Sequence, residues 1–389
     1  MISPKNFYEL LIKKEIKFFT GVPDSLLKDF CAYIVDNTDK KNNIIAANEG
    51  GAIALAAGYH LSSRKIGLVY MQNSGQGNSI NPLVSLTDSD VYSIPMLLLI
   101  GWRGEPGKED EPQHVKQGKI TLELLNTLEI PYEIIPDSIE DAKNSLDKAI
   151  NYMKNNNAPF ALVVKKNTFE KYDLKNKVKT SFDLNREEAM KLIVNNLDSQ
   201  NIIISTTGKI SRELFEYREE LGQEHKTDFL TVGSMGHSSQ IALGIALQKQ
   251  DKQIYCFDGD GSVIMHMGSL AIIGQQAPKN FKHIIFNNGA HDSVGGQPTV
   301  GFEINLQSIA KDCGYKTTLK AESKLEVIEK INLIKSVEGP AFLEIKVNKG
   351  ARKDLGRPTK SSKENKKDFM GFLEKWSKKN ILDLELLKN

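Results

Sequence analysis

The chain has 389 residues, with 51 Lys and Arg against 49 Asp and Glu, 40% hydrophobic residues and 26% charged residues. This composition is typical of a soluble globular protein and excludes disordered and collagen-like chains. The net charge of +2 gives no strong field for nucleic acid, and the longest apolar stretch, residues 94–102, is far shorter than the ~20 residues of a membrane-spanning helix. We therefore expect neither nucleic acid nor a membrane as a partner.

Short aliphatic and β-branched runs alternate with helical patterns in the first part of the chain. This alternation is typical of βα units around a parallel sheet. The expected strands are residues 17–20, 44–46, 66–70, 95–100, 132–135 and 160–164. Apolar residues at helical spacing predict helices at 23–35, 50–61, 115–125 and 139–154. Residues 1–170 are therefore predicted to form one α/β domain.

Residues 171–183 are polar and rich in Lys, as expected for an exposed linker. A second α/β series follows at residues 184–350 and begins with a helix at 185–197. Its expected strands are residues 202–205, 229–231, 254–257, 283–286, 315–319 and 341–347. The predicted fold class is therefore α/β, with two tandem parallel-sheet domains.

Residues 351–389 are predicted to form a basic, helical tail. An apolar stripe at helical spacing predicts that this tail docks on the body of the protein or on a partner subunit. The stripe consists of Phe369, Met370, Phe372, Leu373 and Trp376.

The three cysteines, Cys31, Cys256 and Cys313, are widely separated and show no CxxC spacing. The first residues contain no apolar segment followed by a small-residue cleavage site. We therefore expect a cytoplasmic protein with reduced thiols.

The most informative segment joins an expected strand to a glycine turn and a helix. The strand runs into Gly259-Asp260-Gly261-Ser262, and the next strand ends in Asn287-Asn288. Glycines after a strand let backbone amides approach a phosphate, and the following helix N-terminus favours an anion. Asp and Asn oxygens suit a Mg²⁺ ion that bridges a diphosphate. An ordinary βα turn is the alternative, whereas a dehydrogenase is not favoured because no G-x-G-x-x-G motif lies between a strand and a helix.

With 28 positions from Asp260 to Asn288, this segment resembles the GDG…NN motif of thiamine diphosphate-dependent enzymes. The resemblance implies thiamine diphosphate and Mg²⁺ as cofactors. It further implies that Asp260, Asn288 and the backbone carbonyl of Ala290 hold the metal. The residues implied at the diphosphate are Gly259, Gly261 and Ser262.

Two further segments carry the same resemblance. Glu49 precedes a small-residue helix that ends in Gly-Tyr, and the family places there the carboxylate that protonates the cofactor's pyrimidine ring. Gly233 would accept a hydrogen bond from the aminopyrimidine, and Met235 would wedge between the cofactor's rings. Without a cofactor, Glu49 would be an acid at the N-terminus of a packed helix, and Met235 could fill the core.

The resemblance implies a pyrimidine domain followed by a diphosphate domain, and the short linker leaves no room for a middle domain. Residues 101–107 and 354–359 are most similar to family members that decarboxylate 3-phosphonopyruvate to phosphonoacetaldehyde and CO₂. Sulfopyruvate is the alternative substrate. An acetolactate synthase-like carboligase is less favoured because the flavin-carrying middle domain is missing. A non-catalytic subunit is less favoured because Glu49 and the metal motif occur together.

Loops after the first-domain strands carry Asp24, Gln113 and His114, and the resemblance to related decarboxylases implies that groups at this edge relay protons. His114 is the preferred donor, and His291 is its rival. The negative charges of a phosphonate and a carboxylate call for cations. Arg103 and Lys209 are the candidates for substrate binding, together with Arg352 and Arg357.

The same resemblance implies how the chains assemble. In this family the cofactor lies between the first domain of one subunit and the second domain of another. The resemblance therefore implies a homodimer or a higher homo-oligomer, which acts on a small 2-oxo acid.

Overall fold

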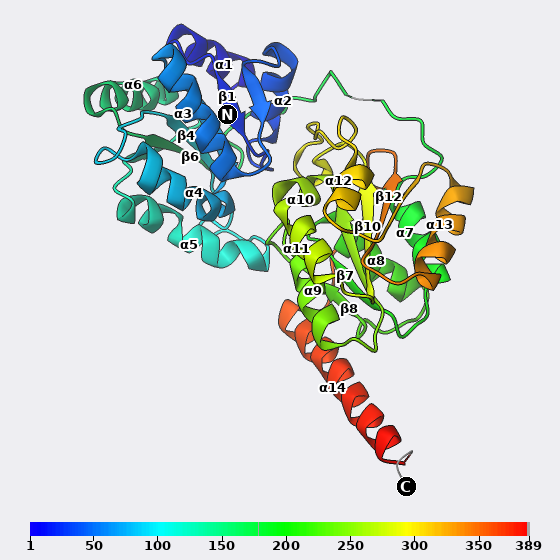
Figure 1. Ribbon diagram of the computed structural model, residues 1–389. Helices are drawn as coiled ribbons and strands as arrows, with labels where there is room; N and C mark the ends of the chain where they lie inside the picture. Colours follow the sequence, from blue (N-terminus) through cyan, green and yellow to red (C-terminus); the bar gives the residue numbers. More distant parts are fainter. Residues whose placement is uncertain (178, 387–389) are drawn as a thin grey trace. The chain divides into compact units, whose positions relative to one another are not determined.

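The computed structural model describes residues 1–177 and 179–386 and, within these, the side chains up to Glu374. The chain divides into two compact units (Figure 1). The first comprises the residues up to 177 and His291–Pro298, and the second comprises Lys179–Ala290 and the chain from Thr299 onward. Among the described residues, no helix is both long and apolar enough to cross a membrane.

The first unit contains a six-stranded parallel sheet with the strand order β2-β1-β3-β4-β6-β5. Its strands are β1 (Phe19–Gly21), β2 (Asn43–Ile45), β3 (Leu68–Gln72), β4 (Leu97–Gly101), β5 (Tyr132–Ile134) and β6 (Phe160–Val164). Its helices are α1 (Pro4–Lys13), α2 (Lys28–Asn37), α3 (Glu49–Ser63), α4 (Gln76–Pro82), α5 (Pro112–Thr127) and α6 (Ile139–Asn156). Side chains of α1, α2 and α6 pack on one face of the sheet, and those of α3 and α5 pack on the other.

The first sheet has a separate core on each face. Leu97 and Leu99 of β4 belong to one buried cluster, whereas Leu98 and Ile100 belong to the other. Successive side chains point to opposite faces of a strand, and such near-continuous apolar runs are typical of parallel sheets that are covered on both sides. Polar side chains with a chemical role are therefore confined to the strand ends and the loops.

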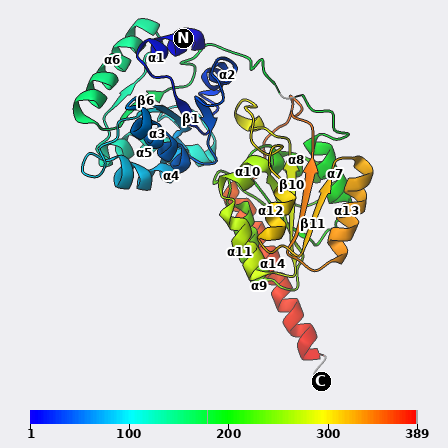
Figure 2. The ribbon, with the colours of Figure 1, turned by 45° about the horizontal axis from the view of Figure 1, so that its top comes forward.

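The second unit contains a six-stranded parallel sheet with the order β11-β12-β10-β9-β7-β8. Two strands of this sheet, β10 and β11, are labelled in Figure 2. Its strands are β7 (Ile202–Ser205), β8 (Asp228–Leu230), β9 (Ile254–Gly259), β10 (Phe281–Asn287), β11 (Thr317–Ala321) and β12 (Ala341–Lys346). Its helices are α7 (Arg186–Asn196), α8 (Lys209–Glu220), α9 (Ser238–Gln248), α10 (Asp260–Met265), α11 (Gly268–Gln276), α12 (Leu306–Asp312), α13 (Lys324–Ser336) and α14 (Ser362–Leu386). Apolar residues again alternate between two cores, with Tyr255 and Phe257 in one and Ile254 and Cys256 in the other.

The predicted α/β class and its two parallel sheets are confirmed, and each of the twelve expected strands overlaps an observed one. The helix expected at residues 23–35 begins only at Lys28. The carboxylate of Asp24 accepts a hydrogen bond from the backbone N–H of Leu26 at 2.9 Å, and this local turn competes with helix formation. The sequence prediction missed α1, which begins with Pro4 at its first position, where proline is tolerated.

The segment predicted as an exposed linker is partly packed on the first unit. Leu174 is buried, and the carboxylate of Asp36 in α2 accepts the backbone N–H groups of Lys175 and Asn176 at 2.8 and 2.9 Å. The carboxylate of Asp36 therefore satisfies two backbone donors of a segment without regular structure. The Lys-rich composition of this segment does not reveal these contacts.

The predicted docking of the tail is realised at the start of α14. Phe369 is buried, and Phe372 and Leu373 pack partly against the same core cluster. Met370 was expected in this stripe but is 46% exposed, because it lies on the side of the helix away from that cluster. Trp376 lies outside the side chains that the structure describes.

A buried asparagine joins α14 to β8, which is the edge strand of the second sheet. Asn365 Oδ1 accepts from the backbone N–H of Leu230 at 3.1 Å, and Asn365 Nδ2 donates to the backbone carbonyl of Asp228 at 2.9 Å. One side chain thus replaces the two hydrogen bonds that a neighbouring strand would make.

We predict that Asn365→Ala lowers the free energy of unfolding by about 2–4 kcal/mol, because two buried backbone groups lose their partners. Urea unfolding, followed by circular dichroism, measures the change. Lys366→Ala alters the next, exposed residue of α14 and should change stability by less than about 0.5 kcal/mol. Equal effects of the two substitutions would contradict the role of Asn365.

Candidate active site

The predicted site residues of the first unit gather at the carboxyl ends of its strands. Asp24 follows β1, Glu49 begins the helix after β2, and Arg103 follows β4. Ligands of open parallel sheets bind at this edge. The sheet therefore places Asp24, Glu49 and Arg103 at one edge, although they are far apart in the sequence.

Glu49 is the first residue of α3 and is 5% exposed. Asn48 caps this helix by accepting from the N–H of Gly51 at 2.9 Å, which leaves Glu49 in the first turn, where the helix dipole favours an anion. Its Oε2 accepts from Asn78 Nδ2 at 2.7 Å. A Cβ at position 75 would lie 2.4 Å from Glu49 Oε1, so the glycine at that position leaves room for the carboxylate.

Asp24 is fully buried at the end of β1. A Cβ on Gly101 would lie 2.1 Å from Asp24 Oδ2, so the end of β4 must be glycine for the carboxylate to fit. Burial raises the pKa of Asp24 to about 6, while the backbone N–H of Leu26 and the charge of Arg103 oppose this rise. The group can therefore exchange a proton close to neutral pH.

Arg103 and His114 share one carboxylate, that of Asp110. Arg103 donates from Nε to Asp110 Oδ2 at 2.8 Å and also from Nη2 to Asp110 Oδ1, and its Nη1 donates to the hydroxyl of Ser25 at 2.6 Å. His114 Nδ1 lies 3.0 Å from Asp110 Oδ1. The cation predicted for the substrate is therefore already paired with a carboxylate of its own chain.

Two residues without an assigned role in the sequence prediction hold this edge together. Asn73 donates from Nδ2 to the carbonyl of Arg103 at 2.8 Å and accepts the N–H of Arg103 at 3.2 Å, which fixes the backbone at the end of β4. Asn78 holds Glu49, as described above. Both lie in a polar run at residues 71–78, and amide side chains directly after a strand were the available signal. Gln113, which the sequence predicted, has a buried Oε1 without a hydrogen-bond partner among the described residues.

In the second unit the glycine turn has the predicted form. The strand β9 ends at Gly259, and α10 begins at Asp260. Asp260 is 2% exposed, and its Oδ2 accepts from the hydroxyl of Thr299. Burial raises the pKa of Asp260 to about 6, against hydrogen bonds from Thr299 and from backbone N–H groups, including that of Asn288.

The neighbouring strand end supports this turn. Asn287 donates from Nδ2 to Glu344 and to the carbonyl of Gly301, each at 2.7 Å. Asn288 Oδ1 accepts from the N–H of Ala290 at 3.1 Å. A Cβ on Gly301 would lie 2.6 Å from Asp260 Oδ2, so this backbone passes close to the carboxylate. Asp260 and Ala290, which the resemblance implies as metal ligands, are thus each in hydrogen-bond contact with Asn288, the third implied ligand.

Hydroxyl and amide groups surround the first turn of α10. The hydroxyl groups of Ser262 and Thr206 lie 3.0 Å apart, and Ser262 Oγ accepts from the N–H of Gly236 at 3.1 Å. Gly233 donates its N–H to Thr207 Oγ1 at 2.9 Å. Met235, from the same loop, is half-buried. The loop after β8 and the turn after β9 are therefore linked within this unit.

The other predicted residues have different surroundings. Lys209 begins α8 directly after β7 and is half-buried, so it lies at the same strand edge as the glycine turn. Arg352 forms ion pairs with Glu187, Glu216 and Asp354, and its charge is therefore occupied within the second unit. His291 lies in the 291–298 segment that belongs to the first unit.

The chemical groups around Asp260 in the second unit indicate whether a cation would fit there. Among the described residues no cationic side chain forms an ion pair with Asp260, whose partners are a hydroxyl and backbone N–H groups. A buried carboxylate without a positive partner is unfavourable, and carboxylate, amide and carbonyl oxygens suit a hard divalent cation. The hydroxyl groups of Ser262 and Thr206 near a helix start suit a phosphate. These residues therefore fit a metal–diphosphate group.

Comparisons with known proteins decide the family. The models of the N-terminal and the C-terminal binding domains of thiamine pyrophosphate enzymes match residues 5–124 and 206–345. The chain is 30% identical over 368 residues to the phosphonopyruvate decarboxylase of Streptomyces viridochromogenes, with 91% of this chain and 90% of that protein covered. The chain belongs to the thiamine pyrophosphate-dependent decarboxylases. This decarboxylase is a carboxy-lyase, and the predicted cofactor, thiamine diphosphate (thiamine pyrophosphate), is confirmed.

Two further relatives name a different substrate. The decarboxylase is 27% identical over 366 residues to the sulfopyruvate decarboxylase of Methanosarcina acetivorans, with 88% of this chain and 90% of that protein covered. It is 42% identical over 146 residues to the sulfopyruvate decarboxylase subunit beta of Methanocaldococcus jannaschii, with 37% of this chain and 73% of that subunit covered. By its name, the latter protein is one subunit of a larger enzyme.

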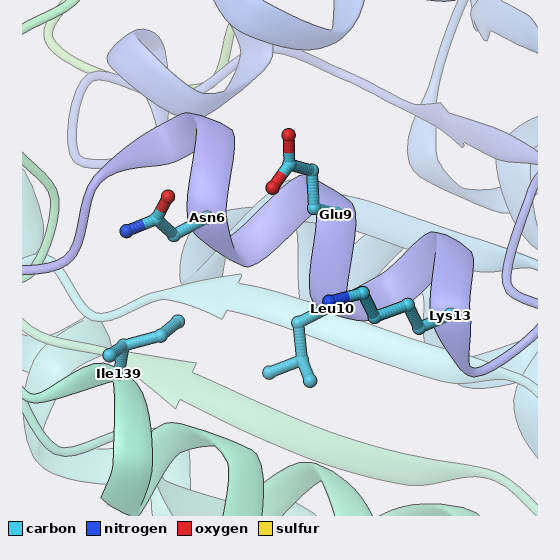
Figure 3. Close-up of a pocket in the computed structure, with 5 residues that line it drawn as sticks. All are labelled: Asn6, Glu9, Leu10, Lys13 and Ile139. Atoms are coloured by element: carbon cyan, nitrogen blue, oxygen red, sulfur yellow. The ribbon is translucent and has the colours of Figure 1, made fainter.

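Two pockets of the decarboxylase lie away from the predicted residues. The smaller has a volume of about 270 Å³ and lies where α1 meets the start of α6 (Figure 3). It is lined by Asn6, Glu9, Leu10, Lys13 and Ile139. The larger, of about 750 Å³, is lined partly by basic residues of the first unit. Neither contains a predicted site residue, so the candidate site rests on the strand edges and not on these pockets.

We predict that Asp24→Asn changes how stability depends on pH. The folded pKa of about 6 exceeds the ordinary 3.8, so the folded state binds this proton more tightly, and the wild type loses up to about 3 kcal/mol of stability as pH rises from 4 to 6. The variant lacks this loss, and its advantage over the wild type should grow across that interval and then stay constant. Urea unfolding at pH 4, 5, 6 and 7 measures the difference, and a constant difference would contradict the prediction.

Proposed function

We propose that this enzyme decarboxylates 3-phosphonopyruvate to phosphonoacetaldehyde and CO₂. The observation that carries the proposal is the match to a phosphonopyruvate decarboxylase along about 90% of both chains. Sulfopyruvate is the second candidate, because a sulfopyruvate decarboxylase also matches along most of its length. Both substrates are 2-oxo acids with a second anionic group, so a cationic substrate site is common to the two proposals.

We assign Arg103 and Lys209 to the anionic groups of the substrate. A guanidinium has five N–H donors, and three of those of Arg103 are used by Asp110 and Ser25. Among the described residues the remaining two have no protein partner, so they can bind a phosphonate oxygen. Lys209 lies at the carboxyl end of β7 in the second unit.

The second unit would hold Mg²⁺ and the diphosphate of the cofactor. The metal ligands in this proposal are Asp260, Asn288 and the carbonyl of Ala290, and the diphosphate meets Gly259, Gly261 and Ser262. The loop after β8 supplies Gly233 as a hydrogen-bond acceptor and Met235 as an apolar wedge. When bound, thiamine diphosphate supplies the carbanion that adds to the keto carbon and the electron sink for loss of CO₂.

The first unit would manage the protons of the reaction. Glu49 is the carboxylate that exchanges a proton with the pyrimidine ring, and Asn78 holds its Oε2. His114 and Asp24 provide groups that pass a proton toward the product, and Gln113, next to His114 in the chain, provides a hydrogen-bonding amide. Asp24 suits this task because burial raises its pKa to about 6, and Gln113 offers a buried carbonyl oxygen without a partner among the described residues.

We further propose that the enzyme is a cytoplasmic homo-oligomer. The three cysteines are not paired with one another, which suits a reducing compartment. A relative named as a subunit matches only part of this chain, whereas this chain carries both thiamine pyrophosphate domains and therefore has no need of a second kind of subunit.

A side-by-side assay with phosphonopyruvate, sulfopyruvate and pyruvate tests the substrate. We expect kcat/KM for phosphonopyruvate to exceed that for pyruvate about 10²- to 10⁴-fold, since two charge-assisted hydrogen bonds contribute about 1.5–3 kcal/mol each. Release of CO₂ and detection of the aldehyde product measure turnover. A larger kcat/KM for sulfopyruvate would replace the phosphonate proposal with the sulfonate one, and a preference for pyruvate would exclude both.

Substitution of the metal ligands tests the cofactor site. We expect Asp260→Ala and Asn288→Ala to abolish the Mg²⁺-dependent part of thiamine diphosphate binding, because each removes an oxygen ligand. Calorimetric titration with the cofactor, with and without Mg²⁺, measures this part directly. Asp312→Ala, an exposed carboxylate of α12, is the control and should bind like the wild type. Unchanged Mg²⁺ dependence in both site variants would refute the metal assignment.

A further inference from the structure

Asp110 lies at the centre of the polar groups that follow β4. Its carboxylate accepts from two nitrogens of Arg103 and from His114 Nδ1. It also accepts from the backbone N–H groups of Gly104 and Glu111, each at 2.8 Å. Its side chain is 14% exposed. Five donors on one carboxylate are more than a simple surface ion pair needs, and they hold Asp110 in a single orientation.

These contacts also keep Asp110 ionised. Burial alone would raise its pKa, but the hydrogen bonds from Arg103 and His114 and from the two backbone N–H groups bring the pKa well below its ordinary value. An ionised carboxylate can only accept hydrogen bonds. The hydrogen between Asp110 and His114 must therefore be on His114 Nδ1.

His114 is thereby restricted to one tautomer. Its side chain is 10% exposed, and burial lowers its pKa, with the charge of Arg103 acting in the same direction. The hydrogen bond and the charge of Asp110 and the charge of Glu111 raise the pKa. With a hydrogen fixed on Nδ1, the neutral ring carries its lone pair on Nε2, and Nε2 is the atom that can take up a proton and return it.

We propose that Asp110 is a positioning residue for the reaction, which fixes the tautomer and orientation of His114 so that proton transfer occurs at Nε2. This inference rests on the role of His114 in the proposed function. Asp110 is not itself a catalytic residue, because its carboxylate lone pairs are occupied by groups of its own chain. The same carboxylate aligns Arg103, so the proton-transfer group and the substrate cation share one support.

A double-mutant cycle with Asp110→Asn and His114→Gln tests the proposal. The amide of Asn can donate as well as accept, so it no longer dictates which nitrogen of His114 carries hydrogen. We expect Asp110→Asn to lower kcat about 10- to 100-fold, the range of losses for residues that orient a metal-ligating histidine. In the His114→Gln background the same change should lower kcat less than about threefold. Equal losses in both backgrounds would overturn the proposal, because Asp110 would then act independently of His114.

The pH dependence of kcat gives a second readout, which loss of packing would not produce. The limb of the kcat–pH profile that disappears in His114→Gln reports the ionisation of this histidine. In Asp110→Asn it should move to lower pH by at least about half a unit, because the group that raises the His114 pKa is removed while the positive charge of Arg103 remains. An unmoved limb would overturn the proposal.

Two further variants complete the design. Glu105→Gln changes a carboxylate of the same loop that pairs with Lys165 at 3.0 Å, and it should leave both kcat and the limb unchanged. If Asp110→Asn does not fold, Asp110→Glu takes its place, because its longer side chain keeps the charge but displaces it from Nδ1. Its loss of kcat should again depend on His114, and a loss independent of His114 would overturn the proposal.

The cycle uses whichever 2-oxo acid the wild type decarboxylates. A preference for sulfopyruvate would therefore change the proposed substrate and leave the role of Asp110 intact. Unaltered kcat in His114→Gln would instead remove the proton-transfer role of His114 and the positioning role of Asp110 together.

Discussion

Burial of both faces of two parallel sheets is the constraint on which the rest of the structure depends. Helices cover each face, so the central strands are largely apolar, as in residues 97–100 of β4. The side chains of the candidate site lie where strands end. This arrangement accounts for the places of Glu49, Asp24 and Arg103 in the first unit and of Asp260 and Asn288 in the second.

The close approach of glycine backbone to a carboxylate is the second recurring feature. Gly75, Gly101 and Gly301 each lie where a Cβ would come within 2.6 Å of a carboxylate oxygen. Glu49, Asp24 and Asp260, the three acids of the candidate site, are therefore packed against main chain rather than against flexible side chains. Main chain of this kind cannot move aside as a side chain can, so the acids keep their positions and their burial, and for Asp24 and Asp260 burial is the cause of the raised pKa.

The strands and the main chemical groups could be predicted because their signals are local. Each strand is a short apolar run, and Asp260, Asn288 and Glu49 occur within motifs of fixed spacing. Contacts between distant or individually ordinary residues could not be predicted. Asn365 forms hydrogen bonds with residues of β8 that are 135 and 137 positions away in the sequence, and Asn73 forms one with Arg103, 30 positions away. Asp110, which forms the ion pair with Arg103, lies only seven positions away. No sequence pattern indicates which of the neighbouring acidic residues forms this pair.

The hydrogen bonds of Asn365 between α14 and β8 affect whether another copy of the chain can pair with this edge strand. An edge strand with unpaired N–H and carbonyl groups is a template for another strand, and proteins protect such edges in order to avoid aggregation. Here the groups of Asp228 and Leu230 are already occupied by Asn365. A chain shortened before α14 would expose β8 together with the apolar surface that Phe369 covers. The start of α14 therefore occupies the groups of β8 with which a strand of another copy would pair.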